Sequence, residues 1–442
     1  MLRELRQKTL GLTRSRYRRS PIQSAHSVGA LGGAIGIVLA ACSPSPPTPT
    51  VTILGSITGD GEATIAEVLA PFEEANGIDV VYEGTDQFAT VLIARLTAGN
   101  PPDIALFPQP GLMADLAREG DLIALDDVLS NEQLESAFDR QWLELASVDD
   151  RPYGIWARAS LKSLVWYSPP VFAAAGYEVP STWEELQALS DRMVSDGNIP
   201  WCIGLESGAA SGWPGTDWVE EFVLRQSGPQ VYDRWVSGDT PFSEPAIASA
   251  FSSFAELVQD GDRVLGGAVG AISTPFGDSP AALFDDPPGC YLHRQASFIS
   301  TFFPDTVEPG RDVAVFPFPA MNPEFSNVLL VSGEQFGLLS DTPEARAMME
   351  YLTTAEPHRI WSQAEGFVSP FRGIAIASYT DPNTRKQAEV LASADTLRFD
   401  GSDLMPGEVG TGAFWEGIID LASGTADLDT VLADIDRRWP QD

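Results

Sequence analysis

The sequence predicts an α/β fold, because short β-rich runs alternate with amphipathic helical segments in the first part of the chain. Apolar residues recur at helical spacing within residues 63–77 and 88–99, and both segments end in glycine. Apolar, β-rich runs lie around them at residues 51–57, 78–84 and 102–107. Alternation of this kind with short connections is typical of a parallel sheet whose crossovers are helices.

Later segments continue the mixed pattern without an internal repeat. Residues 181–194 begin with Ser and Thr ahead of acidic residues, which is the chemistry of a helix N-terminus. We also predict helices at residues 343–354 and 428–439, and a short one at 113–118. Pro and Gly are frequent between residues 260 and 325, where we expect surface loops and crossings between lobes rather than regular elements.

The composition describes a folded and strongly acidic protein. Of the 442 residues, 44% are apolar and 10% aromatic, and 62 acidic against 27 basic side chains give a net charge of −35. Nucleic-acid binding is excluded, because it needs a basic patch that replaces the counterions of phosphate. We interpret the acidity as a solvated surface that keeps the protein soluble.

The N-terminal segment reads as a leader for export. Residues 1–41 carry seven Arg and Lys side chains and one acid, and they end in an uncharged apolar run that is short for a bilayer span. The sequence Leu-Ala-Ala-Cys at residues 39–42 resembles the lipobox of bacterial lipoproteins. We therefore predict a lipoprotein signal peptide at 1–41, lipidation of Cys42 and a Pro-rich tether over 42–50. The alternative is an ordinary signal peptide or a weak membrane anchor with an incidental cysteine.

Export also bears on the other two cysteines. With Cys42 lipidated, Cys202 and Cys290 remain, and they lie in an oxidising compartment. A disulfide between them is the simplest prediction. Two buried free thiols are the alternative.

No motif for catalysis, a metal or a cofactor stands out. His26 lies in the leader, and neither His293 nor His358 has a partner at metal-ligand spacing. The glycine-rich stretch 55–64 lacks the features of a P-loop or of a dinucleotide fingerprint, and no G-x-S-x-G elbow occurs. Carboxylates are so abundant that any pair of them could be proposed as a glycosidase acid and base. The sequence therefore gives no positive evidence for an enzyme.

Cations and tryptophans point instead to binding. Arg158 and Lys162 lie four residues apart in the apolar, aromatic segment 153–167, a spacing that puts them on one face of a strand or of a helix. We interpret them as functional in so acidic a protein, and local salt bridges to surface acids are the alternative. Residues 201–218 contain three of the eleven tryptophans. Aromatic platforms with charged or amide groups are the means by which proteins hold sugars.

Several blocks of the sequence resemble a known family, the extracellular solute-binding proteins of sugar ABC transporters, which includes maltose-binding proteins. The blocks are residues 72–84, 96–127, 153–189 and 403–435, and the similarity covers nearly all of residues 51–440. Residues 108–112 and 201–218 look most like the α-glucoside-binding branch.

The resemblance implies the type II fold of periplasmic binding proteins, with two α/β lobes around a cleft that a hinge motion closes on the ligand. We expect one lobe at residues 51–155 with 311–345 and the other at 156–310 with 346–442. The implied function is a lipid-anchored, extracytoplasmic subunit of an ABC importer. It would capture a carbohydrate, an α-glucoside or other oligosaccharide, and deliver it to the membrane permease. It would act as a monomer and need no cofactor.

The resemblance also implies a set of ligand-binding residues. Phe107 and Gln109 follow the third strand, where ligand loops of such sheets lie. Arg158 stands where maltose-binding members have an acid, which favours another ligand. The expected set, drawn from loops and helix starts of both lobes, is Asp60, Phe107, Gln109, Arg158, Lys162, Trp213, Asp217, Trp218 and Trp415.

Two other functions stay open at this point. The same fold could hold an anionic or polyamine ligand, and Arg158 and Lys162 would favour an anion. A secreted glycan-degrading enzyme is the third possibility. The periplasm and the outer face of a cell membrane are both open as locations.

Overall fold

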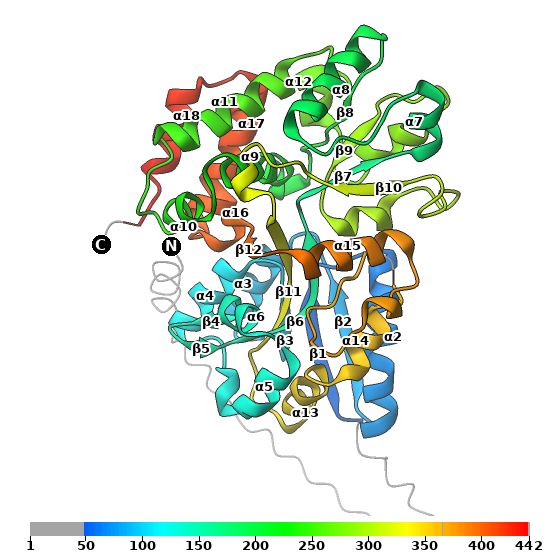
Figure 1. The fold of residues 1–442 in the computed structure, drawn as a ribbon. Helices are drawn as coiled ribbons and strands as arrows, with labels where there is room; N and C mark the ends of the chain where they lie inside the picture. The colour runs from blue at the N-terminus through cyan, green and yellow to red at the C-terminus, as the bar shows by residue number, and fades with distance from the viewer. Residues whose placement is uncertain (1–47, 365, 441–442) are drawn as a thin grey trace, which may run out of the picture.

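The computed structural model describes residues 48–364 and 366–440, which form two α/β lobes, one below the other in Figure 1. The first lobe contains a six-stranded sheet in the order β12-β11-β3-β1-β2, with β6 paired to β11. Its strands are β1 (Thr50–Gly55), β2 (Asp79–Gly84), β3 (Ile104–Phe107), β6 (Gly154–Leu161), β11 (Val328–Leu338) and β12 (Thr396–Phe399). A two-stranded sheet beside them pairs β4 (Ser147–Val148) with β5 (Arg151–Pro152).

The second lobe contains a four-stranded sheet in the order β10-β7-β9-β8. Its strands are β7 (Leu164–Tyr167), β8 (Trp201–Cys202), β9 (Leu292–Arg294) and β10 (Ala314–Pro317). The predicted α/β class is confirmed, and the parallel pairing expected in the first half holds for β1 with β2 and with β3. Strand β11 runs antiparallel to β3 and to β6, so the sheet of the first lobe is mixed.

Helices cover both sheets. Those of the first lobe are α2 (Asp60–Asn76), α3 (Phe88–Thr97), α4 (Pro110–Glu119), α5 (Asn131–Ala137), α6 (Arg140–Leu145), α13 (Pro343–Leu352) and α14 (Ala355–Trp361). Those of the second lobe are α7 (Pro169–Ala175), α8 (Trp183–Ser195), α9 (Trp213–Ser227), α10 (Pro229–Val236), α11 (Pro245–Gln259), α12 (Gly267–Ser273), α16 (Gly401–Leu404), α17 (Trp415–Ser423) and α18 (Leu428–Asp436). Helix α15 (Pro382–Ser393) lies at the waist between the lobes (Figure 1).

The ends of the predicted helices have the expected chemistry. Gly77 ends α2 with a left-handed φ of 64°, a conformation that glycine adopts without steric cost. The side chain of Thr182 accepts a hydrogen bond from the backbone N–H of Glu185 at the start of α8, as its place in the sequence predicts.

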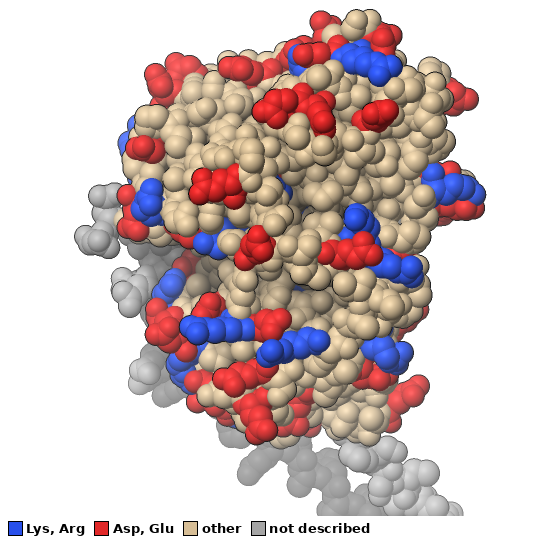
Figure 2. Space-filling model, in the orientation of Figure 1, with Lys and Arg blue, Asp and Glu red and all other residues tan. Residues whose placement is uncertain are grey.

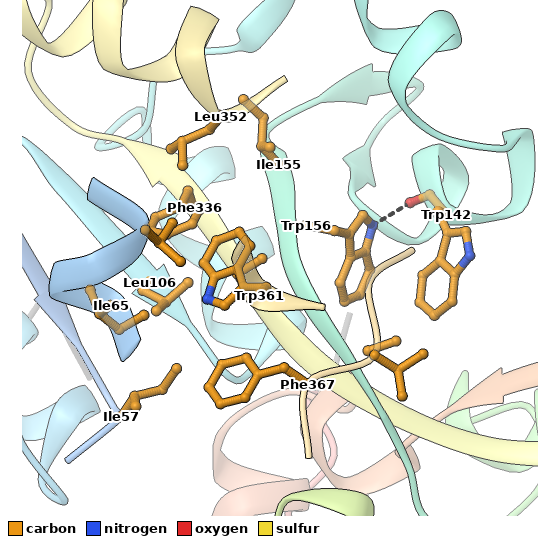
Figure 3. Close-up of a cluster of buried hydrophobic side chains, with 14 of the residues drawn as sticks. Ile57, Ile65, Leu106, Trp142, Ile155, Trp156, Phe336, Leu352, Trp361 and Phe367 are labelled. Atoms are coloured by element: carbon orange, nitrogen blue, oxygen red, sulfur yellow. Dashed lines mark hydrogen bonds between the residues drawn. The ribbon is translucent and has the colours of Figure 1, made fainter. Parts of the chain in front are cut away.

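The core of the first lobe packs around β6, which is buried along its whole length. Figure 3 shows Trp156, on β6, beside Trp142 and on the other side of the strand from Trp361 and Phe336. The indole Nε1–H of Trp156 donates to the backbone carbonyl of Trp142 at 2.7 Å, which satisfies the one polar group that this side chain buries.

Three connections join the two lobes. The chain leaves the first sheet between β6 and β7, returns between β10 and β11, and leaves it again after β12 to enter α16. The first and third connections are short. Residues 162–163 make the first, and Asp400 alone separates β12 from α16. Side chains at these positions are therefore held close to both lobes.

Two expectations about the organisation of the chain are corrected. Much of residues 346–399, expected in the second lobe, belongs to the first, because α14 packs against α2 and β12 pairs with β11. Residues 156–161, also expected in the second lobe, belong to β6 of the first sheet, and residues 314–317, expected in the first lobe, form β10 of the second sheet. The stretch 260–325 is not only loops, because it contains α12, β9 and β10. Both strands are three or four residues long, and pairing with β7 stabilises them.

Acidic and basic side chains are interspersed on the face drawn in Figure 2, without a large patch of one sign. Among the described residues, no helix is long and apolar enough to cross a bilayer. Cys42 and the leader lie outside the described residues.

The predicted disulfide is present. Cys202 on β8 and Cys290, two residues before β9, are bonded with their Cα atoms 5.6 Å apart. The bond joins positions 88 residues apart and fixes the edge of the second sheet. The pairing is the one that the sequence predicted for these two cysteines.

We predict that the double variant Cys202→Ser/Cys290→Ser unfolds more easily, because the bond restricts the unfolded chain over a long loop. The free energy of unfolding should fall by about 2–4 kcal/mol in urea titrations. Wild-type protein treated with reductant is the matched control and should show the same loss. Two alkylatable thiols in unreduced wild-type protein would contradict the assignment.

Candidate ligand-binding site at the lobe junction

Lys162 lies in the first connection between the lobes and is almost fully buried, with 3% of its surface exposed. Its ammonium donates to Asp217 Oδ1 at 2.6 Å and to Asp400 Oδ2. Asp217 belongs to α9 of the second lobe, and Asp400 forms the third connection. The backbone N–H of Lys162 donates to the carbonyl of Leu330 on β11 at 2.8 Å. One residue thus ties the first and third connections to β11 of the first lobe and to α9 of the second.

The neighbouring residue extends this arrangement. Ser163 Oγ donates to Glu221 Oε2 at 2.8 Å and accepts from the backbone N–H of Leu330 at 2.8 Å. Glu221, on α9, also pairs with Arg225 at 2.7 Å and with Arg294 at 3.2 Å. Helix α9 is therefore anchored to the first connection by the Lys162–Asp217 ion pair and the Ser163–Glu221 hydrogen bond, and all four partners are buried.

Carboxylates outnumber cations in this buried cluster. Burial and the neighbouring charges therefore shift the pKa values of several of its groups. Burial opposes the charged form of Lys162, but Asp217 and Asp400 outweigh it, so that the pKa of the ammonium lies above its usual range. Burial, with the charge of Asp400, raises the pKa of Glu220 well above its ordinary value. Burial and Asp400 act in the same way on the pKa of Asp403.

Arg158 is neutralised separately. Its guanidinium makes two hydrogen bonds of 2.6 Å with the carboxylate of Glu334, across the pairing of β6 with β11. The same group lies 4.5 Å from the ring centre of Phe367 and 5.7 Å from that of Phe298. Arg158 and Lys162 therefore have carboxylate partners within the protein, and neither is a free receptor for an anion.

A cluster of partly exposed aromatic rings, which we call the aromatic surface, lies beside these cations on the second lobe. It consists of Trp213, Phe276, Phe298 and Phe302. Adjacent ring centres are 5.1–6.4 Å apart, and Phe302 is 45% exposed. The Lys162 ammonium lies 5.1 Å from the ring centre of Trp213. An apolar surface next to fixed polar groups suits a ligand with both kinds of surface.

The other expected residues are placed differently. Trp218 is 2% exposed and packs against Trp201 inside the second lobe, so it does not belong to the aromatic surface. Phe107 is fully buried against Phe88. Trp415 is 8% exposed, and its Nε1–H donates to Ser402 Oγ at 3.3 Å.

Two positions of the expected set lie at helix starts. Gln109 precedes α4 and keeps part of its surface exposed. Asp60 begins α2, and its side chain lies outside the described part of the structure. The structure thus brings together Arg158, Lys162, Trp213 and Asp217 of the expected set. Sequence reasoning missed the three phenylalanines of the aromatic surface, which come from the stretch expected to be loops.

The sequence profile of the bacterial extracellular solute-binding proteins matches residues 55–358. The chain belongs to this family. Its members are the substrate-binding components of ABC transporters and not enzymes. Among the described residues of this solute-binding protein, no group of three or more His, Cys, Asp or Glu side chains could hold a metal ion.

Two curated relatives are similar over most of their length. The osmoprotective compounds-binding protein GgtB of Synechocystis sp. is 51% identical over 391 residues, 88% of this chain and 92% of the relative. The alpha-glucosides-binding periplasmic protein AglE of Rhizobium meliloti is 42% identical over 398 residues, 88% of this chain and 87% of the relative.

Solved structures agree on the fold. The bacterial solute receptor AcbH superimposes with a TM-score of 0.77 at 19% identity, covering 88% of this chain and 98% of AcbH. A chitin oligosaccharide binding protein gives a TM-score of 0.76 at 19% identity with the same coverage. The expected type II fold of periplasmic binding proteins is confirmed.

We predict that Lys162→Met strongly destabilises this solute-binding protein, because Asp217 and Asp400 would then be buried without their cation. The free energy of unfolding in urea should fall by about 3–5 kcal/mol. Lys386→Met is the matched control, because Lys386 is exposed and meets Glu389 only at 3.6 Å. That variant should lose less than about 1 kcal/mol.

A further variant separates charge from packing. Asp217→Asn with Asp400→Asn, added to Lys162→Met, removes the uncompensated carboxylates and should restore part of the lost stability. Equal and small losses for Lys162→Met and Lys386→Met would contradict the assignment.

Proposed function

We propose that this protein captures a carbohydrate, an α-glucoside or other oligosaccharide, between its lobes and delivers it to the permease of an ABC importer. The observation that carries the proposal is the aromatic surface beside the Arg158 and Lys162 ion pairs at the junction of the lobes. Sugar rings have flat C–H faces that pack on aromatic rings, and hydroxyls that bind charged groups. Closure of the lobes would cover the second side of the ligand.

The named relatives support this ligand class. AglE is described as binding α-glucosides and GgtB as binding osmoprotective compounds, and an α-glucoside is the ligand that we carry to this chain. An anionic ligand is less well supported than the sequence suggested, because both cations at the junction already have carboxylate partners. We also propose that Cys42 anchors the protein to the membrane as a lipoprotein and that it acts there as a monomer.

Binding is tested by the melting temperature and tryptophan fluorescence of the protein from residue 42 onward. Maltose and trehalose represent α-glucosides, glucose 6-phosphate represents anions and spermidine represents polyamines. We expect an α-glucoside to raise the melting temperature at micromolar concentration and to change the fluorescence. A response only to glucose 6-phosphate or to spermidine, or to none of the four, would contradict the proposal.

We predict that Trp213→Ala weakens binding of the responding α-glucoside roughly ten- to hundredfold, because the indole gives the sugar its apolar contact. Ile376→Ala is the control, since Ile376 is a partly exposed apolar side chain of the first lobe, outside the aromatic surface. Its affinity should match the wild type in calorimetric titrations. Unchanged affinity in Trp213→Ala would remove this residue from the site.

A further inference from the structure

A second place suited to a ligand lies within the second lobe. A cavity of about 410 Å³ opens between α8, α9 and α11, and aromatic side chains form its inner wall. These are Trp183 on α8, Trp201 on β8, and Trp218 and Phe222 on α9. The residues that line the cavity belong to the second lobe, except Met321 in the connection between β10 and β11, and none belongs to the aromatic surface. The cavity is therefore separate from the aromatic surface.

The aromatic wall is rigid and only partly covered. Trp201 and Trp218 meet at 5.0 Å with their planes at 83°, and Trp183 and Phe222 meet at 5.9 Å and 75°. Trp201, Trp218 and Phe222 are nearly buried, whereas Trp183 keeps part of its surface exposed at the mouth. No hydrogen bond joins the indole N–H of Trp183, Trp201 or Trp218 to another described residue. These donors remain available to a ligand.

Polar side chains, among them two amides and two carboxylates, line much of the rest of the cavity. Gln187 and Gln226 lie at its edge, and neither side-chain amide bonds to a described residue. Glu256 adds a carboxylate that forms no ion pair in the described part of the chain. The one cation of the lining, Arg263, is already paired with Asp191 and with Asp260. The cavity thus lacks a free cation for an anionic ligand.

Trp218 offers no open face to an organic cation. A cage for a cation needs open aromatic faces. The guanidinium of Arg294 already lies 5.6 Å from the ring centre of Trp218, and Phe222 and Phe318 pack on the same indole. Free amide groups, in contrast, donate to and accept from hydroxyls, and a carboxylate accepts from two of them.

We propose that this cavity is a second carbohydrate-binding site, which takes a neutral sugar about one or two rings in size. The sugar packs one C–H face on Trp183 and bonds its hydroxyls to Gln187, Gln226 and Glu256. The site lies on the second lobe alone, so it does not require the lobes to close. The inference is independent of the ligand proposed for the lobe junction.

Calorimetric titration of the protein with D-glucose, maltose and trehalose, up to millimolar concentrations, tests the proposal. We expect two equivalents of sugar per wild-type protein, and the loss of one equivalent in Trp183→Ala. Gln226→Leu keeps the volume of the side chain and removes its amide, and should weaken the same equivalent roughly tenfold. Melting curves establish that both variants are folded.

Trp213→Ala is the matched variant at the lobe junction and should leave the cavity equivalent unchanged. If Trp183→Ala removes a sugar equivalent and Trp213→Ala removes none, the proposal for the junction fails and this one stands. The second site would be overturned if the wild type bound at most one equivalent of each sugar and only Trp213→Ala lost that equivalent. Binding of choline to the cavity in place of sugar, abolished in Trp183→Ala, would overturn it as well.

Discussion

The buried ammonium of Lys162 is the constraint on which the arrangement of the two lobes depends. A charge taken out of water is costly unless opposite charges lie in direct contact with it. The two carboxylates that meet this need come from α9 of the second lobe and from the third connection between the lobes. Satisfying Lys162 therefore holds the connections beside one another and beside α9. The hinge of this protein is a point of strong ionic contact, not a loose linker.

Helix α9 carries this constraint to the surfaces that can bind ligands. Its first residue, Trp213, belongs to the aromatic surface, and Asp217 one turn later pairs with Lys162. Trp218 and Phe222 lie on the wall of the second cavity. One helix therefore links the hinge, the proposed sugar site at the junction and the proposed site within the lobe. Of the three tryptophans in residues 201–218, Trp213 belongs to the aromatic surface, whereas Trp201 and Trp218 lie together on the wall of the second cavity.

The sequence predicted what depends on local pattern. Helices α2 and α8 follow from the spacing of their apolar residues, from Gly77 at the end of α2 and from Thr182 at the start of α8. The disulfide follows from the two cysteines that remain after the predicted leader and Cys42 are set aside. The sequence did not predict features that depend on contacts between residues far apart in the chain. Strand β12 belongs to the first lobe only because β11 lies beside it. No local sequence pattern marks Phe276 and Phe298 as part of the site, because they are far from Trp213 in the sequence and contact it only in the folded protein. The sequence identifies Lys162 as a candidate functional residue, but not its carboxylate partners, which lie 55 and 238 residues away along the chain.

The central claim is that a sugar binds at the junction while the Lys162 cluster keeps the connections together. Crystal structures of the protein with and without its α-glucoside would test this most directly. The account predicts a sugar ring against Trp213, a changed angle between the lobes, and Lys162 in contact with Asp217 and Asp400 in both structures. The absence of a sugar at the aromatic surface, or a cluster that separates when the ligand binds, would contradict it.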